Sequence, residues 1–157
     1  MATDTPVLRW YRTASRLPGG RQLFSQAFRF VAPYFRTIPA TVREVEPGRA
    51  VVDMRHLPWV RNHLGTVHAI ALCNLAELSM GLAAEATVPP TQRWIPKGME
   101  VAYRAKARGT MHAVANLDLP ADVGEGVEVP CEVSVVDDGG TEVFTATITL
   151  WVTAKKA

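Results

Sequence analysis

Apolar residues recur along this chain with two different spacings, and the change of spacing separates helical from strand-forming segments. Within residues 20–38 they recur every three or four positions, as in an amphipathic helix that packs on a larger body. These apolar residues are Leu23, Ala27, Phe30, Val31 and Tyr34. Because Pro33 removes a backbone donor, we expect this helix to end or bend near residues 30–32.

Residues 66–86 form the longest apolar stretch. Their length, their alanine and leucine content and the lack of an internal proline predict a helix, which Pro89 and Pro90 end. Apolar residues occupy almost every side of this helix. We therefore expect it to be buried on most sides, in the middle of the fold.

Alternation of apolar and polar residues predicts six strands. Residues 40–54 are typical of two short strands joined by a turn at Pro47 and Gly48. Further along the chain, four segments alternate with a period of two and are separated by glycine-containing turns. These segments are residues 99–107, 110–119, 127–137 and 142–155. In the last segment, the expected core face consists of Phe144, Ala146, Ile148, Leu150 and Val152.

The order of these elements indicates the fold class. One helix, two strands, one long buried helix and four strands do not alternate in the way that a parallel sheet requires. We therefore predict an α+β fold, in which an antiparallel sheet curls around one central helix. The 157 residues fit a single domain, residues 1–157, with an N-terminal helical extension over about residues 1–37.

Composition narrows the possible functions. The formal net charge is +2, and the lack of a Lys/Arg run argues against nucleic acid as a partner, although a small anionic ligand would suit the mild excess. The two cysteines, Cys73 and Cys131, have neither metal-ligand spacing nor a disulfide framework, which favours a reducing compartment. We find no signal peptide and no stretch that approaches a membrane span, and we expect a cytoplasmic protein without a metal.

Glu77 is the most unusual residue of the central helix, because charged groups are rarely buried unless they are paired. On a helix it shares one stripe with Cys73, Asn74 and Gly81. It could be a structural carboxylate, paired with an arginine or exposed at an edge. Alternatively, a carboxylate held in a partly desolvated cleft could act as a general base or nucleophile, which is the reading we favour.

The start of the central helix offers a complementary group. If Gly65 or Thr66 caps the helix, free N–H groups of Val67, His68 and Ala69 would stabilise the oxyanion of an acyl-transfer intermediate. Glu77 lies roughly 13 Å beyond His68 along the axis, at 1.5 Å per residue. Both groups can reach one substrate only if two antiparallel copies of the helix meet across a two-fold axis. The chemistry therefore implies a dimer.

The remaining polar residues have alternative interpretations. Asn62 and His63 could form an Asx-type turn and cap, or could contact substrate. His68 could be a core histidine bonded to backbone, which we favour slightly, or a catalytic base. We expect His56 and His112 at surface or sheet positions.

The stretch NHLGTVHAIALCNLAE, residues 62–77, resembles the signature of hotdog-fold thioesterases of the phenylacetyl-CoA thioesterase-like group. Asn62, Gly65, His68 and Glu77 match it in spacing. The resemblance implies a hotdog fold, a homodimer or homotetramer, and no cofactor other than the coenzyme A of the substrate. It also implies that Asn62 and the Ala69 N–H polarise the thioester carbonyl, while Glu77 of the partner subunit acts as general base or nucleophile.

Two departures from this signature point to an uncharacterised branch of the superfamily. Ala69 and Ile70 stand where the group commonly has two glycines. The stretch RWIPKGME, residues 93–100, offers Lys97 and Glu100 where some members have a hydroxyl residue.

The leading hypothesis is hydrolysis of an acyl-CoA-type thioester. The expected acyl pocket includes Leu72, Met80 and Trp94, and Gly65, Cys73 and Asn74 complete the candidate substrate-binding set. Residues that could meet the phosphates of coenzyme A are Arg61, Arg93, Lys97, Arg104, Lys106 and Arg108. Two alternatives stay open: a non-catalytic protein that binds acyl-CoA or a fatty acyl chain, and, less favoured, a hydratase or dehydratase of acyl thioesters.

Overall fold

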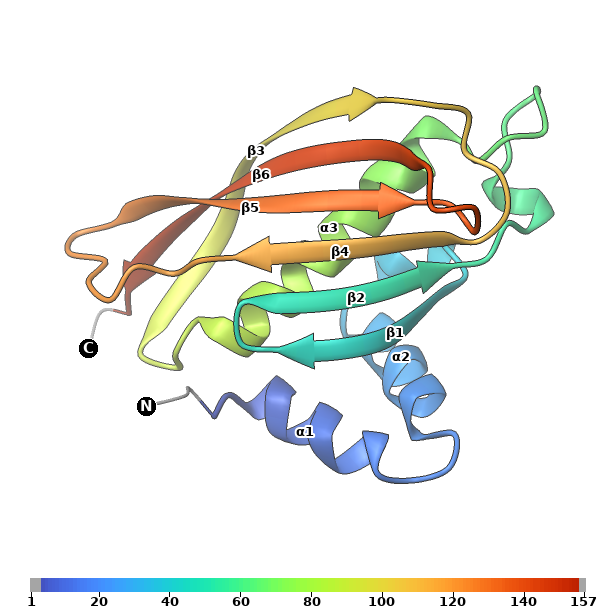
Figure 1. Cartoon of the computed structure of the whole chain (residues 1–157). Coiled ribbons are helices and arrows are strands. Elements are labelled where there is room, and N and C mark those ends of the chain that lie inside the picture. The colour runs from blue at the N-terminus through green and yellow to red at the C-terminus, as the bar shows by residue number, and fades with distance from the viewer. Residues whose placement is uncertain (1–3, 156–157) are drawn as a thin grey trace.

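The computed structural model describes residues 4–155, in which a six-stranded antiparallel sheet curls around the central helix α3 (Ala69–Thr87), as Figure 1 shows. The strands lie in the order β1-β2-β4-β5-β6-β3. Their bounds are β1 (Ala40–Glu46), β2 (Arg49–Met54), β3 (Gln92–Tyr103), β4 (Met111–Leu117), β5 (Val127–Val136) and β6 (Glu142–Ala154). The predicted α+β fold, with one helix inside an antiparallel sheet, is confirmed.

The core lies between α3 and the concave face of the sheet. In β6, the predicted core residues Phe144, Ile148 and Leu150 are almost completely buried, and the intervening threonines are half-exposed. Helix α3 is long and apolar enough to cross a membrane by length and composition alone, which contradicts the expectation that no stretch approaches a membrane span. However, 67% of its most apolar stretch is buried inside the fold. Its apolar surface is therefore explained by packing against the sheet.

Two element boundaries differ from the predictions. The central helix begins at Ala69 instead of near residue 66, because His68 is its N-cap. Strand β3 begins at Gln92 and ends at Tyr103, whereas the alternation had suggested residues 99–107. An irregularity between Pro96 and Gly98 shifts the register of β3 against β6. It interrupts the alternation of apolar and polar residues, so the first part of the strand does not show the two-residue period.

The N-terminal extension contains two helices and a short 3₁₀ helix: α1 (Pro6–Ser15), α2 (Gly20–Val31) and η1 (Pro33–Thr37). The end of α2 at Val31 confirms the expected effect of Pro33. Helix α1 was not predicted. Its first turn is capped by Thr5, whose Oγ1 accepts a hydrogen bond from the N–H of Leu8 at 3.3 Å.

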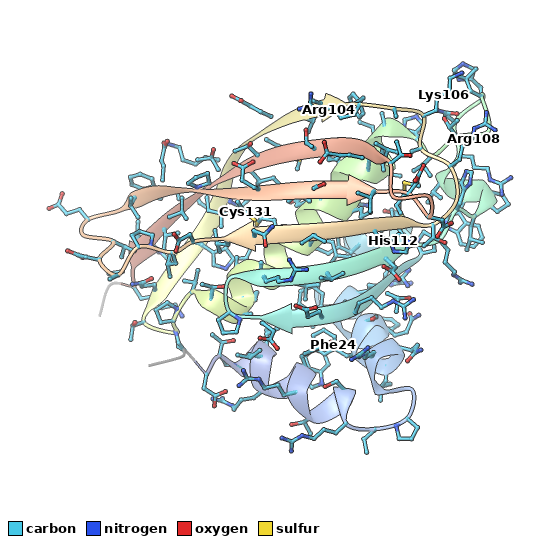
Figure 2. All side chains as sticks on the ribbon, viewed as in Figure 1. Phe24, Arg104, Lys106, Arg108, His112 and Cys131 are labelled. Atoms are coloured by element: carbon cyan, nitrogen blue, oxygen red, sulfur yellow. The ribbon has the colours of Figure 1, made fainter. Side chains whose placement is uncertain are left out.

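Helix α2 packs through a different face from the one that its apolar spacing indicated. Phe24, labelled in Figure 2, and Phe28 are buried, whereas Leu23 and Phe30 are each 67% exposed. Phe24 lies 4.6 Å from the ring of Trp10 and 5.2 Å from that of Tyr11, measured between centroids. Aromatic contacts between α1 and α2 therefore decide the orientation of α2.

The two edges of the sheet differ. The edge at β1 is covered by α1 and α2: Ser25 Oγ accepts from the Val42 N–H at 2.8 Å, and Tyr11 Oη donates to the Arg43 carbonyl at 2.6 Å. The outer edge of β3 has no partner strand among residues 4–155, and most of its side chains are exposed. Because unpaired strand edges invite pairing with another chain, β3 is the edge available for association.

Candidate functional site

The N-terminus of α3 leaves one backbone donor free. His68 is the N-cap of α3, and its Nδ1 accepts from the Ile70 N–H at 3.1 Å. It is bonded to the backbone, as one interpretation expected, but it is exposed and does not lie in the core. The N–H groups of Val67 and His68 donate to the carbonyls of Ala107 and Val60. The Ala69 N–H has no acceptor within residues 4–155. Of the three predicted donors, only that of Ala69 can point at a ligand, and the predicted cap at Gly65 or Thr66 is wrong.

The loop before α3 is fixed by Asn62. Its Oδ1 accepts from the N–H groups of Leu64 and Thr66 at 3.0 and 3.2 Å, and its Nδ2 donates to Thr66 Oγ1 at 2.9 Å. Gly65 allows the tight turn, because its φ of +72° lies in the left-handed region. The Asx-turn interpretation of Asn62 is confirmed, and its side chain holds the loop against the start of α3.

A cavity of about 410 Å³, which we call the amide cavity, lies beside the Ala69 N–H. It is bordered by Asn62, Thr66, Val67, Ala69, Leu72, Tyr103, Arg104, Ala105, Lys106 and Ala107. None of these residues is acidic. Tyr103 Oη lies 3.4 Å from Cys73 Sγ, and this contact, together with burial, raises the pKa of Tyr103. Sequence reasoning missed Tyr103, although a tyrosine at the end of an edge strand was a visible signal.

Glu77 borders a second cavity of about 350 Å³, the carboxylate cavity, between α3, the end of α2 and β3. Its other lining residues are Val7, Phe28, Val31, Ala32, Phe35, Met80, Gly81, Glu85, Trp94 and Pro96. Glu77 is half-buried and forms no ion pair with any described residue. Met80 and Trp94 lie in the same cavity as Glu77, as the predicted acyl pocket requires. Leu72 instead borders the amide cavity.

Asn74 lies in a third, smaller cavity of about 200 Å³ between α3 and η1, which Arg61, His68 and Ile70 also border. Asn74 is buried, and its Nδ2 donates to Thr37 Oγ1 at 2.8 Å. Because Ile70 faces this third cavity, its β-branched side chain does not line the amide cavity beside Ala69.

Two basic candidates lie away from both main cavities. Lys97 pairs with Glu128 and lies 5.1 Å from the ring of Trp151. Arg93 donates to Thr153 Oγ1 at 3.2 Å. By contrast, Arg104, Lys106 and Arg108 follow one another at alternate positions after β3, as Figure 2 shows, and none forms an ion pair within the described chain. Within residues 4–155 no cluster of three or more His, Cys, Asp or Glu could hold a metal ion.

This architecture is the hotdog fold of the thioesterase superfamily. A Pseudomonas aeruginosa protein of unknown function, PA5026, described as a probable thioesterase, is 25% identical, with a TM-score of 0.74 over 88% of this chain and 97% of that chain. A thioesterase family protein from Silicibacter pomeroyi has the same fold, with 18% identity and a TM-score of 0.70 over 83% of this chain and 96% of that one.

A structural-genomics crystal structure, APC5556, is 37% identical, with a TM-score of 0.82 over 95% of this chain and 99% of that chain. Residues 20–152 match the model of the family described as domain of unknown function DUF4442, and the chain belongs to this family. No curated protein matches the sequence.

Proposed function

We propose that this protein hydrolyses acyl thioesters at a site shared by two subunits. The observation that carries the proposal is that α3 presents two groups without a hydrogen-bond or ion-pair partner among the described residues, one a donor and the other a carboxylate. The Ala69 N–H is a free donor in the amide cavity, and the Glu77 carboxylate has no described partner in a cavity of otherwise mainly apolar residues. An oxyanion donor and a general base are the two groups that thioester hydrolysis requires.

The geometry of one chain keeps these groups apart. Glu77 lies eight positions after Ala69 on the helix, which is about 12 Å at 1.5 Å per residue. The free edge of β3 provides a route to a two-fold dimer, because it carries Ile95, 58% exposed, and Val101, 38% exposed. In such a dimer, antiparallel copies of α3 would bring the Glu77 of one protomer toward the Ala69 of its partner.

The proposed reaction uses the two groups in sequence. Glu77 accepts a proton from a water molecule as the water oxygen attacks the thioester carbonyl carbon. Alternatively, the Glu77 carboxylate attacks this carbon itself, and water hydrolyses the resulting mixed anhydride after the thiolate has left, which releases the acid and restores the carboxylate. The carbonyl oxygen becomes negative and accepts the hydrogen bond of the Ala69 N–H. Collapse of the tetrahedral intermediate then breaks the carbon–sulfur bond, and the thiolate leaves and takes up a proton.

Charge and polarity suggest how the substrate lies. The acyl group would occupy the carboxylate cavity, because Met80 and Trp94 provide apolar contacts there. The rest of the thioester would leave past Arg104 and Lys106 of the amide cavity, with Arg108 beyond. Basic side chains without carboxylate partners suit the phosphates of coenzyme A, so we propose acyl-CoA as the substrate class.

A thiol-release assay over acyl-CoAs of different length and aromatic character tests this function. We expect Glu77→Gln to lose about 100-fold or more in kcat, within the usual range for a general base. Glu85→Gln is the matched control: it lies on the same helix and borders the same cavity, but its Oε1 already accepts from Trp94 Nε1 at 3.2 Å. Full activity of Glu77→Gln on every substrate would exclude the mechanism.

A second candidate, a non-catalytic protein that binds acyl-CoA, is favoured by one observation. One N–H of the Asn62 amide donates to Thr66 Oγ1 and its Oδ1 accepts from the loop, so the side chain is held in its own loop and only its second N–H is left for a substrate carbonyl. Tight binding of acyl-CoAs without any thiol release would support this candidate, whereas turnover by the wild-type protein would reject it.

A further inference from the structure

The N-terminal extension differs in charge from the rest of the chain. Residues 1–38 contain six arginines and a single acidic residue, Asp4, whereas residues 39–157 contain eleven basic and fourteen acidic residues. Asp4 pairs with Arg9 at 3.5 Å. Arg12, Arg16 and Arg21 are exposed and form no ion pair within residues 4–155. The extension is thus strongly basic on a domain whose remainder is slightly acidic.

The same extension exposes large apolar side chains next to these arginines. They are Trp10, Leu17, Leu23, Phe30, Val31 and Tyr34, and they range from 38% to 76% exposed. Leu23 and Phe30, two turns apart, lie on one side of α2. The guanidinium of Arg36 lies 5.1 Å from the centroid of the Phe30 ring, so a cationic group adjoins an exposed apolar side chain there. We call the exposed surface of α1, α2 and η1, with these arginines and apolar side chains, the arginine face.

Of these apolar residues, Trp10 packs on Phe24 and Val31 borders the carboxylate cavity, whereas Leu17, Leu23 and Phe30 are 62% to 67% exposed. Aromatic contacts among Tyr11, Phe24 and Phe28 hold the two helices together, and Gly20 approaches Ala14 closely. The hydrogen bond from the Val42 N–H to Ser25 Oγ holds α2 on β1. Figure 1 shows α1 and α2 beside β1, at the opposite edge of the sheet order from β3. Apart from Val31, which borders the carboxylate cavity with Trp94 and Pro96 of β3, the arginine face lies at the other edge of the sheet from the free β3 edge through which we expect dimerisation.

We propose that the arginine face docks on an anionic membrane surface. Arginines interleaved with tryptophan, phenylalanine and leucine on exposed helices are the composition of segments that lie in the headgroup region, where apolar side chains insert and arginines contact lipid phosphates. A second copy of the chain suits this face less well. A two-fold contact would place the arginines of one copy against those of the other, and like charges repel. This proposal does not rest on the thioesterase activity.

Co-sedimentation with vesicles tests the proposal. We expect the wild-type protein to bind vesicles made of equal parts phosphatidylcholine and phosphatidylglycerol, to bind pure phosphatidylcholine vesicles much more weakly, and to be released by high salt. The variant with Arg12, Arg16 and Arg21 changed to Gln should bind about 100-fold more weakly, because each cation near an anionic surface contributes about fivefold. Absence of vesicle binding, or equal binding to both compositions, would overturn the proposal.

A second pair of variants separates apolar insertion from charge. Leu23→Gln with Phe30→Gln should lose vesicle binding without any change of charge, while Leu64→Gln, a change of the same kind at a leucine that is 64% exposed in the loop before α3, should keep it. Sedimentation velocity without vesicles tests the alternative that this face is a contact between two copies of the chain. If Leu23→Gln with Phe30→Gln lowers the oligomeric state of a protein that still unfolds cooperatively, the face is a contact between copies and the membrane proposal fails.

Discussion

Ala69 and Glu77 lie on the same helix but border different cavities. The Ala69 N–H is free beside the basic residues that follow β3, whereas the Glu77 carboxylate lies among apolar side chains about two turns further along. Neither group has a described partner that would explain its position. A hydrolytic role for both therefore depends on a second subunit.

Gly81 controls the size of the carboxylate cavity. A Cβ built at this position would lie 3.9 Å from Trp94 Cη2, an ordinary contact. We expect Gly81→Ala to raise the free energy of unfolding by up to about 1 kcal/mol through helix propensity. The new methyl group should shift the acyl-CoA preference to shorter chains. A raised melting temperature with an unaltered chain-length profile would show that this cavity does not hold the acyl group.

Ser25 joins the N-terminal extension to the sheet. Its Oγ accepts from the buried Val42 N–H, so Ser25→Ala leaves that donor without a partner. We expect the free energy of unfolding to fall by about 1–3 kcal/mol in urea denaturation. Ser15→Ala is the control, because the Ser15 hydroxyl bonds only within α1 and is near the surface. Equal effects of the two changes would contradict this account of the covered β1 edge.

His112 links β4 to β2 and to the turn before β6. Its Nδ1 lies 2.8 Å from Asp53 Oδ1, and its Nε2 lies 3.2 Å from Asp138 Oδ1. The hydrogen bond with Asp53, above all, raises the pKa of His112. A group with a raised folded-state pKa stabilises the protein fully below its unfolded pKa, about 6.5 for histidine. This stabilisation is lost as the pH rises through the folded-state value.

The stability difference between wild type and His112→Gln should therefore be largest near pH 5.5 and should shrink as the pH rises above about 6.5. Thermal unfolding across this range measures it. The range stays above the acidic region in which Asp138 titrates, since the Thr110 N–H and His112 lower the pKa of that carboxyl. A difference that grew with pH would contradict the ion pairs at His112.

The two cysteines should differ in reactivity. Burial raises the pKa of Cys131 to about 12, and its side chain is fully enclosed under the sheet, whereas Cys73 is only half-buried. Ellman's reagent should modify one thiol in the native protein and both after unfolding. Cys73→Ser should abolish the native reaction. Modification of Cys131 in the folded protein would mean that the core between β5 and α3 is open.

The sequence predicted most of the fold, because periodicity records which residues face the core. The alternation in β6 and the all-round apolar α3 are two examples. It failed where a tertiary contact overrode the local pattern. The regular stripe of Leu23 and Phe30 predicted the packed side of α2, but the aromatic residues of α1 hold Phe24 instead. A strand irregularity at Pro96 likewise concealed half of β3.

The candidate site was predictable in part. Of the helix stripe predicted around Glu77, Gly81 borders the same cavity, whereas Asn74 borders another. Met80 and Trp94, expected in the acyl pocket, also border the cavity of Glu77. Spacing could not show that the Val67 and His68 N–H groups bond to Ala107 and Val60, since those partners are distant or lie in irregular loops. For the same reason, the neighbourhood of Cys73 and Tyr103 was not foreseen.

A complementation assay tests the shared site most directly. Ala69→Pro removes the proposed oxyanion donor with little expected strain, because proline suits the first helical position and His68 already has an extended ψ of 139°. Ala69→Pro and Glu77→Gln should each lose about 100-fold or more in kcat.

When the two variants are unfolded together and refolded as a mixture, half of the dimers should be mixed, and each mixed dimer should contain one site with both wild-type groups. We predict recovery of about a quarter of the wild-type activity. Activity that stays at the level of the separate variants, although mixed dimers form, would contradict a site built from Glu77 of one subunit and Ala69 of the other.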